Sequence, residues 1–174
     1  MAEFTERQLK ELDLDWYCLI NGKPTHIASM GGMIPKSFRD RRKLRSQQDF
    51  VAQLIPVTEV RLYMENIQTQ IADGYEYLQD SMIMKTIEDT NRDIPGFAYL
   101  KDYELPVRLF ATTFVEKARK GFRSFARREG VEGNEYILIA EPMNPTEFYS
   151  NQLNLQELEC KRGADDNTFV IEIE

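Results

Sequence analysis

The chain has 174 residues, of which 42% are hydrophobic and 29% are charged, and its net charge at pH 7 is −7. This composition excludes a wholly disordered chain, and the length suits a single domain spanning residues 1–174. The acidic balance argues against general nucleic-acid binding, which needs a basic surface to neutralise phosphates. It favours solubility or a basic partner.

The cysteine content and the N-terminal sequence predict a cytoplasmic protein. Cys18 and Cys160 are too few for a disulfide framework, although a single bridge between them stays open. Residues 1–15 are acidic and lack the apolar core of a signal peptide. No segment approaches the about 18 consecutive apolar residues of a membrane span, so we expect no contact with a membrane.

The clearest local pattern is a β-hairpin near the N-terminus. Residues 16–20 favour a strand, and the Asn21-Gly22 pair is typical of a type I′ turn, whose two central residues both need positive φ. The second strand would span residues 23–29, and Pro24 predicts that it is an edge strand or has Pro24 on its non-bonded side. A two-residue turn predicts these cross-strand pairs: Trp16 with Ile27, Tyr17 with His26, Cys18 with Thr25, and Ile20 with Lys23.

The rest of the chain predicts a mixture of helices and strands. Apolar and polar residues alternate over 58–64, which favours a strand, but the same apolar residues also fit helical spacing. We expect a short helix or loose tail at 1–12, helices starting after Ser37 and at Ser46, a strand at 58–64, a helix at 66–86, an ordered loop or short strand at 93–106, a helix at 112–127 with Gly121 in its interior, strands at 135–141 and 169–174, a cap at Thr146, and an acidic turn at 163–167. The fold class is therefore α+β, with a mostly antiparallel sheet, an N-terminal hairpin and helices packed on one face.

The single histidine, His26, is the first candidate for acid–base chemistry. Its predicted cross-strand neighbour is Tyr17, and Cys18 points to the opposite face of its strand, so a Cys18–His26 nucleophile pair is not expected. We therefore predict a structural His26 and no catalytic residue. One His and two distant Cys match no ligand spacing of a zinc site, so we expect neither a metal nor a cofactor.

Two surfaces remain as candidates for binding. A pocket at the hairpin and its exit loop would use Trp16, Tyr17, His26, Ser29, Gly31 and Gly32. The two glycines either allow a tight bend or present backbone amides to an anion. The second surface is the basic segment at 36–45, with six basic residues and one acidic residue, and its cations are Lys36, Arg39, Arg41, Arg42, Lys43 and Arg45. It predicts a solvated helix face that pairs with the acidic C-terminal third, with nucleic acid and an acidic protein as alternatives.

Two blocks of the chain show a family resemblance. Asp15-Trp16-Tyr17, His26-Ile27-Ala28-Ser29, Gly31-Gly32 and Pro35 resemble the start of a group of uncharacterised bacterial proteins, which read Asp-Trp-Phe, then His-Phe-x-Ser-x-Gly, then Pro. Ala118–Phe122 and Tyr136–Pro142 are similar to a second block in the same proteins. This chain departs from the pattern with Tyr17 and Ile27, where those proteins have Phe, and with Cys18, where they have Ala.

The resemblance implies a small bacterial cytoplasmic protein, and some of the similar proteins look like immunity proteins that neutralise a toxin. It carries over no catalytic residue. With the acidic C-terminal third, it favours a non-enzymatic domain that binds another protein, such as a basic toxin. The alternatives are a small-molecule or enzyme domain with a pocket at the hairpin, and nucleic-acid binding through residues 36–45.

Overall fold

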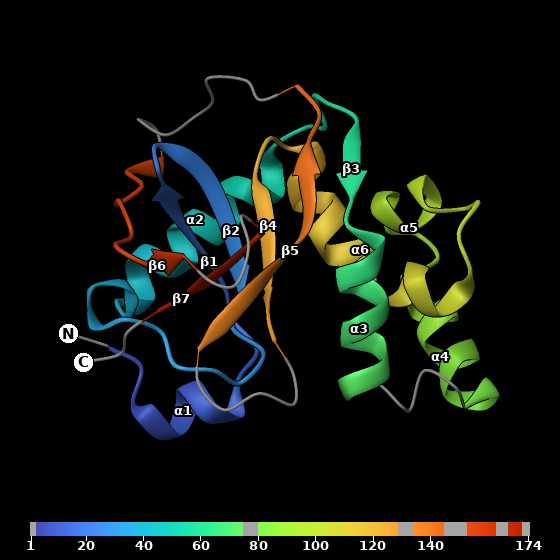
Figure 1. The fold of residues 1–174 in the computed structure, drawn as a ribbon, viewed down its shortest axis with the longest axis horizontal. Coiled ribbons are helices and arrows are strands. Elements are labelled where there is room, and N and C mark those ends of the chain that lie inside the picture. The colour runs from blue at the N-terminus through green and yellow to red at the C-terminus, as the bar shows by residue number, and fades with distance from the viewer. Residues whose placement is uncertain (1–2, 75–79, 129–133, 145–152, 163–166, 172–174) are drawn as a thin grey trace.

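The computed structural model describes residues 3–74, 80–128, 134–144, 153–162 and 167–171 (Figure 1). Its helices are α1 (Glu6–Glu11), the 3-10 helix η1 (Lys36–Phe38), α2 (Arg41–Gln53), α3 (Met64–Gly74), α4 (Ser81–Asn91), α5 (Pro95–Tyr99) and α6 (Leu105–Arg119). Its strands are β1 (Asp15–Ile20), β2 (Lys23–Ala28), β3 (Val60–Leu62), β4 (Arg123–Arg127), β5 (Glu135–Pro142), β6 (Lys161–Arg162) and β7 (Thr168–Val170). The α+β class is confirmed.

The strands form one mixed sheet in the order β1-β2-β4-β5-β7-β6, and β3 pairs with β5 beside β7. Strands β2 and β4 are parallel, whereas the other named pairs are antiparallel. The sheet is therefore not purely antiparallel. Of the two alternatives for the second hairpin strand, the edge strand was wrong, because β2 lies between β1 and β4. The other is confirmed. Pro24 precedes the pairing with β4, which begins at Thr25. Its cross-strand partner Leu19 hydrogen-bonds Gln156 and Leu158, so Pro24 lies on a non-bonded side.

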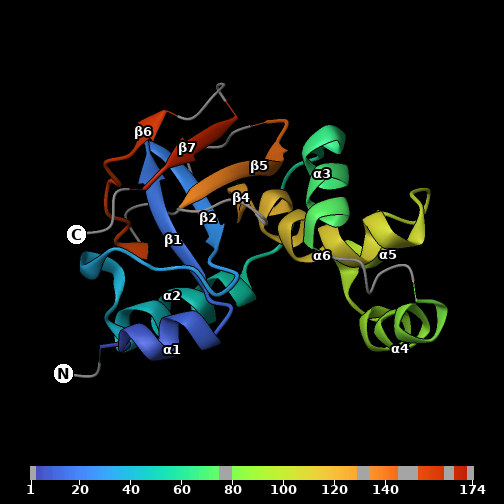
Figure 2. The same ribbon diagram turned by 60° about the horizontal axis from the view of Figure 1, so that its bottom comes forward.

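Both faces of the sheet are covered, so the prediction that helices pack on one face was wrong. Ile137 and Ile139 of β5 pack with α3 and α6 in one buried cluster. Leu138, on the opposite face, packs in a second cluster with Leu9 of α1 and Leu44 of α2. Figure 2 shows these two groups of helices on opposite sides of the sheet. The near-continuous apolar sequence of β5 is typical of a strand buried on both faces.

The N-terminal hairpin is confirmed in both its turn and its register. Asn21 and Gly22 have φ values of 51° and 72°, as a type I′ turn requires. The observed pairs include Tyr17 with His26 and Cys18 with Thr25. Because alternate residues point to opposite faces, this register decides which side chains of the hairpin can meet.

The sheet curls until its two ends are joined by residues 156–162, which we term the seam segment. Leu19 of β1 donates its N–H to Gln156 O at 2.8 Å, and Leu158 donates its N–H to Leu19 O at 2.8 Å. Further along the same segment, β6 pairs with β7. Figure 2 accordingly shows β6 and β7 beside the tip of the hairpin. The second core cluster therefore fills the inside of an almost closed sheet.

The predicted helix at 112–127 was wrong at both ends. Helix α6 begins at Leu105, and it ends at Arg119 because Gly121 adopts a φ of 101°. Gly121 donates its N–H to Ala118 O at 3.0 Å, and Phe122 donates its N–H to Lys117 O at 3.1 Å. This pair of bonds is the Schellman arrangement that ends a helix. The chain then turns back as β4, so Gly121 is a helix stop and not an interior residue.

The region before α6 contains more and shorter elements than expected. A strand does lie within the predicted 58–64, as β3, but the predicted helix at 66–86 corresponds to two helices, α3 and α4. Asp80 starts α4, because its carboxylate accepts the N–H groups of Met82 and Ile83. The predicted loop at 93–106 contains α5, with Pro95 in its first turn, as proline prefers.

Capping residues explain where the first two helices begin. Of the two alternatives for residues 1–12, the short helix is confirmed as α1, which begins with a reciprocal capping box between Thr5 and Gln8. Helix α2 starts at neither Ser37 nor Ser46. The carboxylate of Asp40 accepts the N–H groups of Arg42 and Lys43, and the helix continues unbroken to Gln53.

Towards the C-terminus, the strands predicted at 135–141 and 169–174 correspond to β5 and β7, and residues 172–174 of the second prediction lie outside the described residues. The predicted cap at Thr146 and residues 163–166 of the predicted acidic turn lie outside the described residues. None of the helices in the described part of the chain is long and apolar enough to span a bilayer.

Candidate functional site

His26 lies at the centre of a buried polar cluster that links three strands. Its Nε2 is 2.7 Å from Asp15 Oδ1 of β1, and its Nδ1 is 2.5 Å from Ser124 Oγ of β4. The ring is also near Tyr17 and Phe114, at centroid distances of 5.5 and 6.1 Å. The fold therefore assembles an Asp, a His and a Ser, residue types that elsewhere form nucleophilic sites.

Burial decides the charge on this cluster. Desolvation lowers the pKa of His26 and outweighs the carboxylate of Asp15, which acts to raise it. Burial acts to raise the pKa of Asp15, but the charge and hydrogen bond of His26, with the charge of Lys117, lower it overall. Near pH 7, a neutral His26 therefore donates its Nε2–H to an ionised Asp15 and accepts the Ser124 hydroxyl at Nδ1.

The cluster is closed to substrates at its serine end. Both His26 and Ser124 are completely buried, whereas the Asp15 side chain is 33% exposed. A serine nucleophile must reach solvent, and its hydroxyl must meet an attacking position beside an oxyanion site. Ser124 instead lies in the middle of the sheet. The arrangement fixes the imidazole tautomer and ties β1, β2 and β4 together.

The residues predicted to form a binding pocket are divided by the sheet. Tyr17 and His26 share one face, as their pairing predicted, and Tyr17 is 1% exposed. Trp16 points to the opposite face, where it is fully buried. Its ring centroid lies 5.0 Å from that of Phe38. The structure therefore brings Tyr17 and His26 together and separates Trp16 from them.

The exit loop of the hairpin is a second tight turn whose amides serve the fold. Met30 and Gly31 have φ values of 47° and 74°, and Gly32 donates its N–H to Ser29 O at 2.7 Å. Met30 donates its N–H to Asp13 Oδ1 at 2.8 Å. Ser29 is buried and accepts the N–H of Leu14 at 2.8 Å. The loop is a bend held by its own residues and by Asp13 and Leu14, which precede β1.

Both predicted glycines of this loop are required by close neighbours. A Cβ on Gly31 would lie 3.0 Å from the carbonyl oxygen of Lys10 at the end of α1. A Cβ on Gly32 would lie 2.5 Å from Cδ of Arg127 and 2.8 Å from the carbonyl oxygen of Ser29. Steric packing therefore accounts for the Gly-Gly pair without a bound anion.

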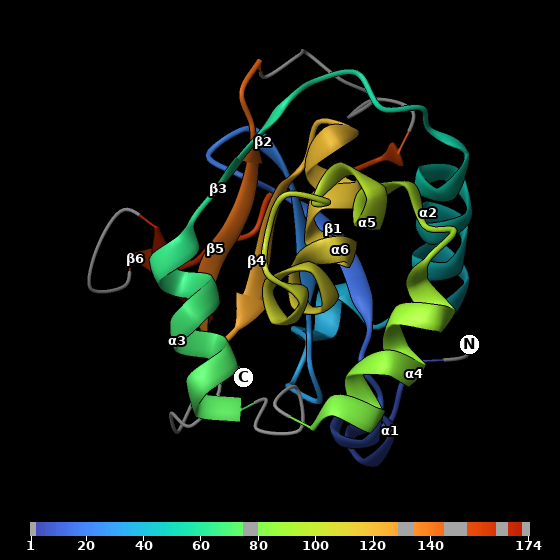
Figure 3. The same ribbon diagram turned by 90° about the vertical axis from the view of Figure 1, so that its right-hand side faces the viewer.

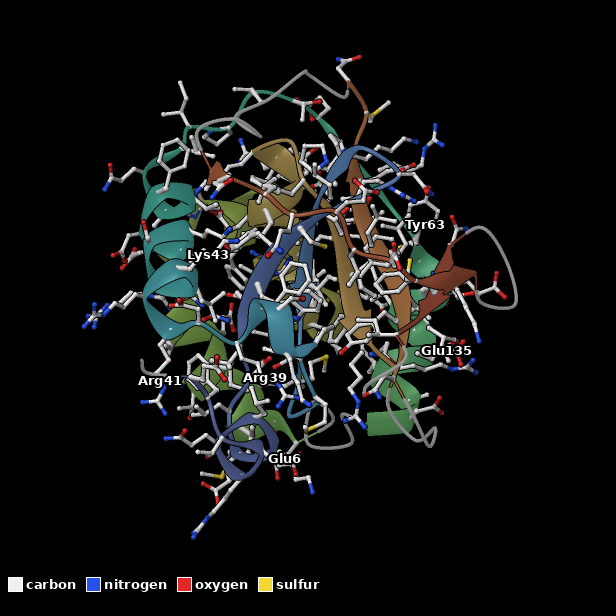
Figure 4. The ribbon with its side chains drawn as sticks, turned by 90° about the vertical axis from the view of Figure 1, so that its left-hand side faces the viewer. Glu6, Arg39, Arg41, Lys43, Tyr63 and Glu135 are labelled. Atoms are coloured by element: carbon white, nitrogen blue, oxygen red, sulfur yellow. The ribbon has the colours of Figure 1, made fainter. Side chains whose placement is uncertain are left out.

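The basic segment does not present its six cations as one surface. Arg39 is 6% exposed, and its Nε donates to Ile34 O at 2.7 Å. Arg41 packs over the Phe4 ring and bonds Gln8, and Lys43 donates to Gln156 of the seam segment. Figure 4 shows Arg41 and Lys43 on the α2 side of the molecule, opposite Tyr63 and Glu135. The exposed cations of the segment are Lys36, Arg42 and Arg45.

The two cysteines are free thiols. Burial raises the pKa of Cys18 well above its usual value and also raises that of the half-buried Cys160. Neither is therefore an activated nucleophile. Among the described residues, no group of three His, Cys, Asp or Glu side chains is arranged to hold a metal ion.

Sequence reasoning missed the two partners of His26. Asp15 could have been found, because it lies two residues before Tyr17 and therefore on the same face of β1 as that neighbour of His26. Ser124 could not, because residues 112–127 were assigned to a helix.

Comparisons with known proteins add no assignment to this geometry: no protein-family model matches the chain, and no similar protein was found among curated proteins or solved structures.

Proposed function

We propose that this chain is a non-enzymatic protein-binding domain that uses an exposed apolar surface at one end of the sheet. This surface, termed the end patch, consists of Ile55, Pro56, Val57 and Met143. The exposed fractions of Ile55, Val57 and Met143 are 72%, 40% and 56%. Exposed large apolar side chains on neighbouring segments are typical of protein interaction sites.

Backbone hydrogen bonds hold the two halves of the end patch together. Met143 donates its N–H to Glu59 O at 2.8 Å, and Asn144 donates its N–H to Thr58 Oγ1 at 3.1 Å. On the other side of this segment, Val57 donates its N–H to Arg119 O at 2.8 Å. Figure 3 shows the segment between α2 and β3 passing the end of β5. The apolar side chains are therefore exposed on an anchored backbone, which reduces the entropy that a partner must remove.

Two further observations support a binding protein over an enzyme. Ser124 and His26 of the Asp–His–Ser cluster have no access to solvent. The resemblance to immunity-like bacterial proteins adds the partner class, a cytoplasmic toxin, and the net charge of −7 suits a basic nuclease. We therefore include the toxin as the proposed partner and the bacterial cytoplasm as the proposed location.

Co-purification with toxins encoded by neighbouring genes, followed by size-exclusion chromatography, tests the proposal. We expect a complex that Ile55→Glu with Met143→Glu abolishes, because two charges would then be buried in the interface. The control is Met82→Glu, since Met82 is 80% exposed on α4 and lies outside the patch. Equal binding by both variants contradicts the end patch, and failure of every candidate toxin to bind contradicts the toxin partner.

A further inference from the structure

A groove opens where the almost closed sheet ends beside the turn of the β1–β2 hairpin. It has a volume of about 650 Å³ and lies between the starts of β2, β4 and β7 and the seam segment. We term it the mouth groove. Its size falls within the range of sites for small molecules, and the mouths of curled sheets are common places for such sites.

The floor of the mouth groove is apolar and well packed. Four buried side chains form it, each at most 6% exposed: Ile20, Phe125, Leu158 and Phe169. Phe125 and Phe169 meet edge to face with their ring centroids 4.8 Å apart. They belong to the second core cluster, so the floor of the groove is rigid.

The rim carries charges of both signs from different elements. Lys23 and Arg123 come from the neighbouring strands β2 and β4, and Glu157 and Glu159 come from the seam segment. No ion pair joins Lys23 or Glu159 to another residue in the described ranges. Cations and carboxylates therefore border one apolar floor without neutralising one another directly.

Arg123 is held in place and lacks a hydrogen bond at Nε. Its guanidinium lies 5.2 Å from the centroid of the Phe125 ring. Its Nε is 3.7 Å from Glu141 Oε2, which exceeds hydrogen-bond length, and this buried nitrogen has no hydrogen-bond partner among the described residues. The Arg123 side chain is 17% exposed and lines the groove, so its cation borders the space where a ligand carboxylate would lie.

We propose that the mouth groove binds a small zwitterion, of the class of amino acids and dipeptides. The ligand carboxylate is bound by Arg123 and Lys23, and its ammonium group by Glu157 and Glu159, above the packed floor. This site is separate from the end patch and does not depend on a protein partner.

Titration of the full-length protein with L-phenylalanine and with the dipeptide Leu-Leu, followed by NMR chemical shifts, tests the ligand class and distinguishes its two members. The matched probes are the N-acetylated and C-amidated forms of each. We expect saturable binding of at least one unmodified probe and about tenfold weaker binding of each capped form, because each cap removes a charge-assisted hydrogen bond. Equal binding of capped and unmodified probes, or no binding by any probe to the folded protein, overturns the proposal.

Variants test which residues of the groove bind the carboxylate and which bind the ammonium group of the ligand. We expect Arg123→Gln and Lys23→Gln to weaken binding of the unmodified probe and to remove its sensitivity to amidation. Glu159→Gln should instead remove its sensitivity to acetylation. The control is Arg61→Gln, because Arg61 also lies near Glu141, at 3.8 Å, but does not line the groove. Thermal unfolding verifies that each variant folds. If Arg123→Gln does not fold, Lys23→Gln carries the test alone, because Lys23 is exposed. Unchanged binding by the variants, or a reversed pattern of sensitivities, contradicts the assignment.

Discussion

The polar groups at the two ends of the β1–β2 hairpin lie in opposite environments. At the end nearest α1, Asp15, His26 and Ser29 are hydrogen-bonded to neighbours, and the last two are fully buried. At the turn end, Lys23 and Glu159 border an open groove and form no ion pair within the described ranges. The single histidine of the sequence therefore marks a structural centre, whereas common charged residues line the groove that we propose as a binding site. Substitutions at the two ends should separate stability from binding.

The largest effect is expected at the buried end. His26→Ala removes the hydrogen-bond partner of the buried Ser124 and of the half-buried Asp15, and it leaves a cavity beside Phe114, so we expect the free energy of unfolding to fall by about 3–5 kcal/mol. Urea denaturation monitored by circular dichroism measures this change. A loss close to zero would mean that the cluster does not stabilise the sheet, and the comparison would fail.

Ser124→Ala should have a smaller effect of the same sign. The variant removes the hydroxyl that bonds Nδ1 of His26 and leaves that nitrogen buried without a partner, at a cost of about 1–3 kcal/mol. Unfolding in urea of the variant and of the double variant with His26→Ala gives the coupling energy. Additive losses in this cycle would contradict a direct Ser124–His26 interaction.

The same cluster should make the stability of the protein fall gradually in acid. Because the pKa of His26 is lower in the folded than in the unfolded protein, the unfolded state binds more protons once the pH falls below about 6.5. Stability should therefore decline from about pH 6.5 downward, with the carboxylate of Asp15 adding a further loss as the pH falls through its lowered pKa. Urea midpoints across this range test the sign. His26→Gln should lack the upper part of the decline and should also change the lower part, because His26 is the main cause of the lowered pKa of Asp15.

The smallest effect on stability is expected at the turn end. Lys23→Ala and Glu159→Gln change exposed side chains without an ion-pair partner in the described ranges, so their urea midpoints should match that of the parent protein. Their binding of the zwitterionic probes should nevertheless weaken. A clear loss of stability in either variant would show that the rim of the groove supports the fold.

The turn and the register of the hairpin could be predicted because their information is local. Asn21-Gly22 fixes the turn, and the turn fixes the pairing of Tyr17 with His26. The α6–β4 region could not, because Phe114, Ala118 and Phe122 keep helical spacing past the true end of the helix at Arg119. Only the pairing of β4 with β2 and β5, which involves residues distant in sequence, selects a strand there. The environment of His26 depends on that pairing, so the hydrogen bond to Ser124 was out of reach.

The seam segment gives the chain an unusually late step in its assembly. Gly22 and Glu157, which meet through a hydrogen bond, are separated by 135 positions. During synthesis, the outer edge of β1 at Leu19 stays uncovered until the seam segment has left the ribosome, which happens after almost all other elements have done so. Contacts of such long range slow folding, and an uncovered strand edge is a site of aggregation in the interval. The hairpin forms early from local signals, and its protection comes last.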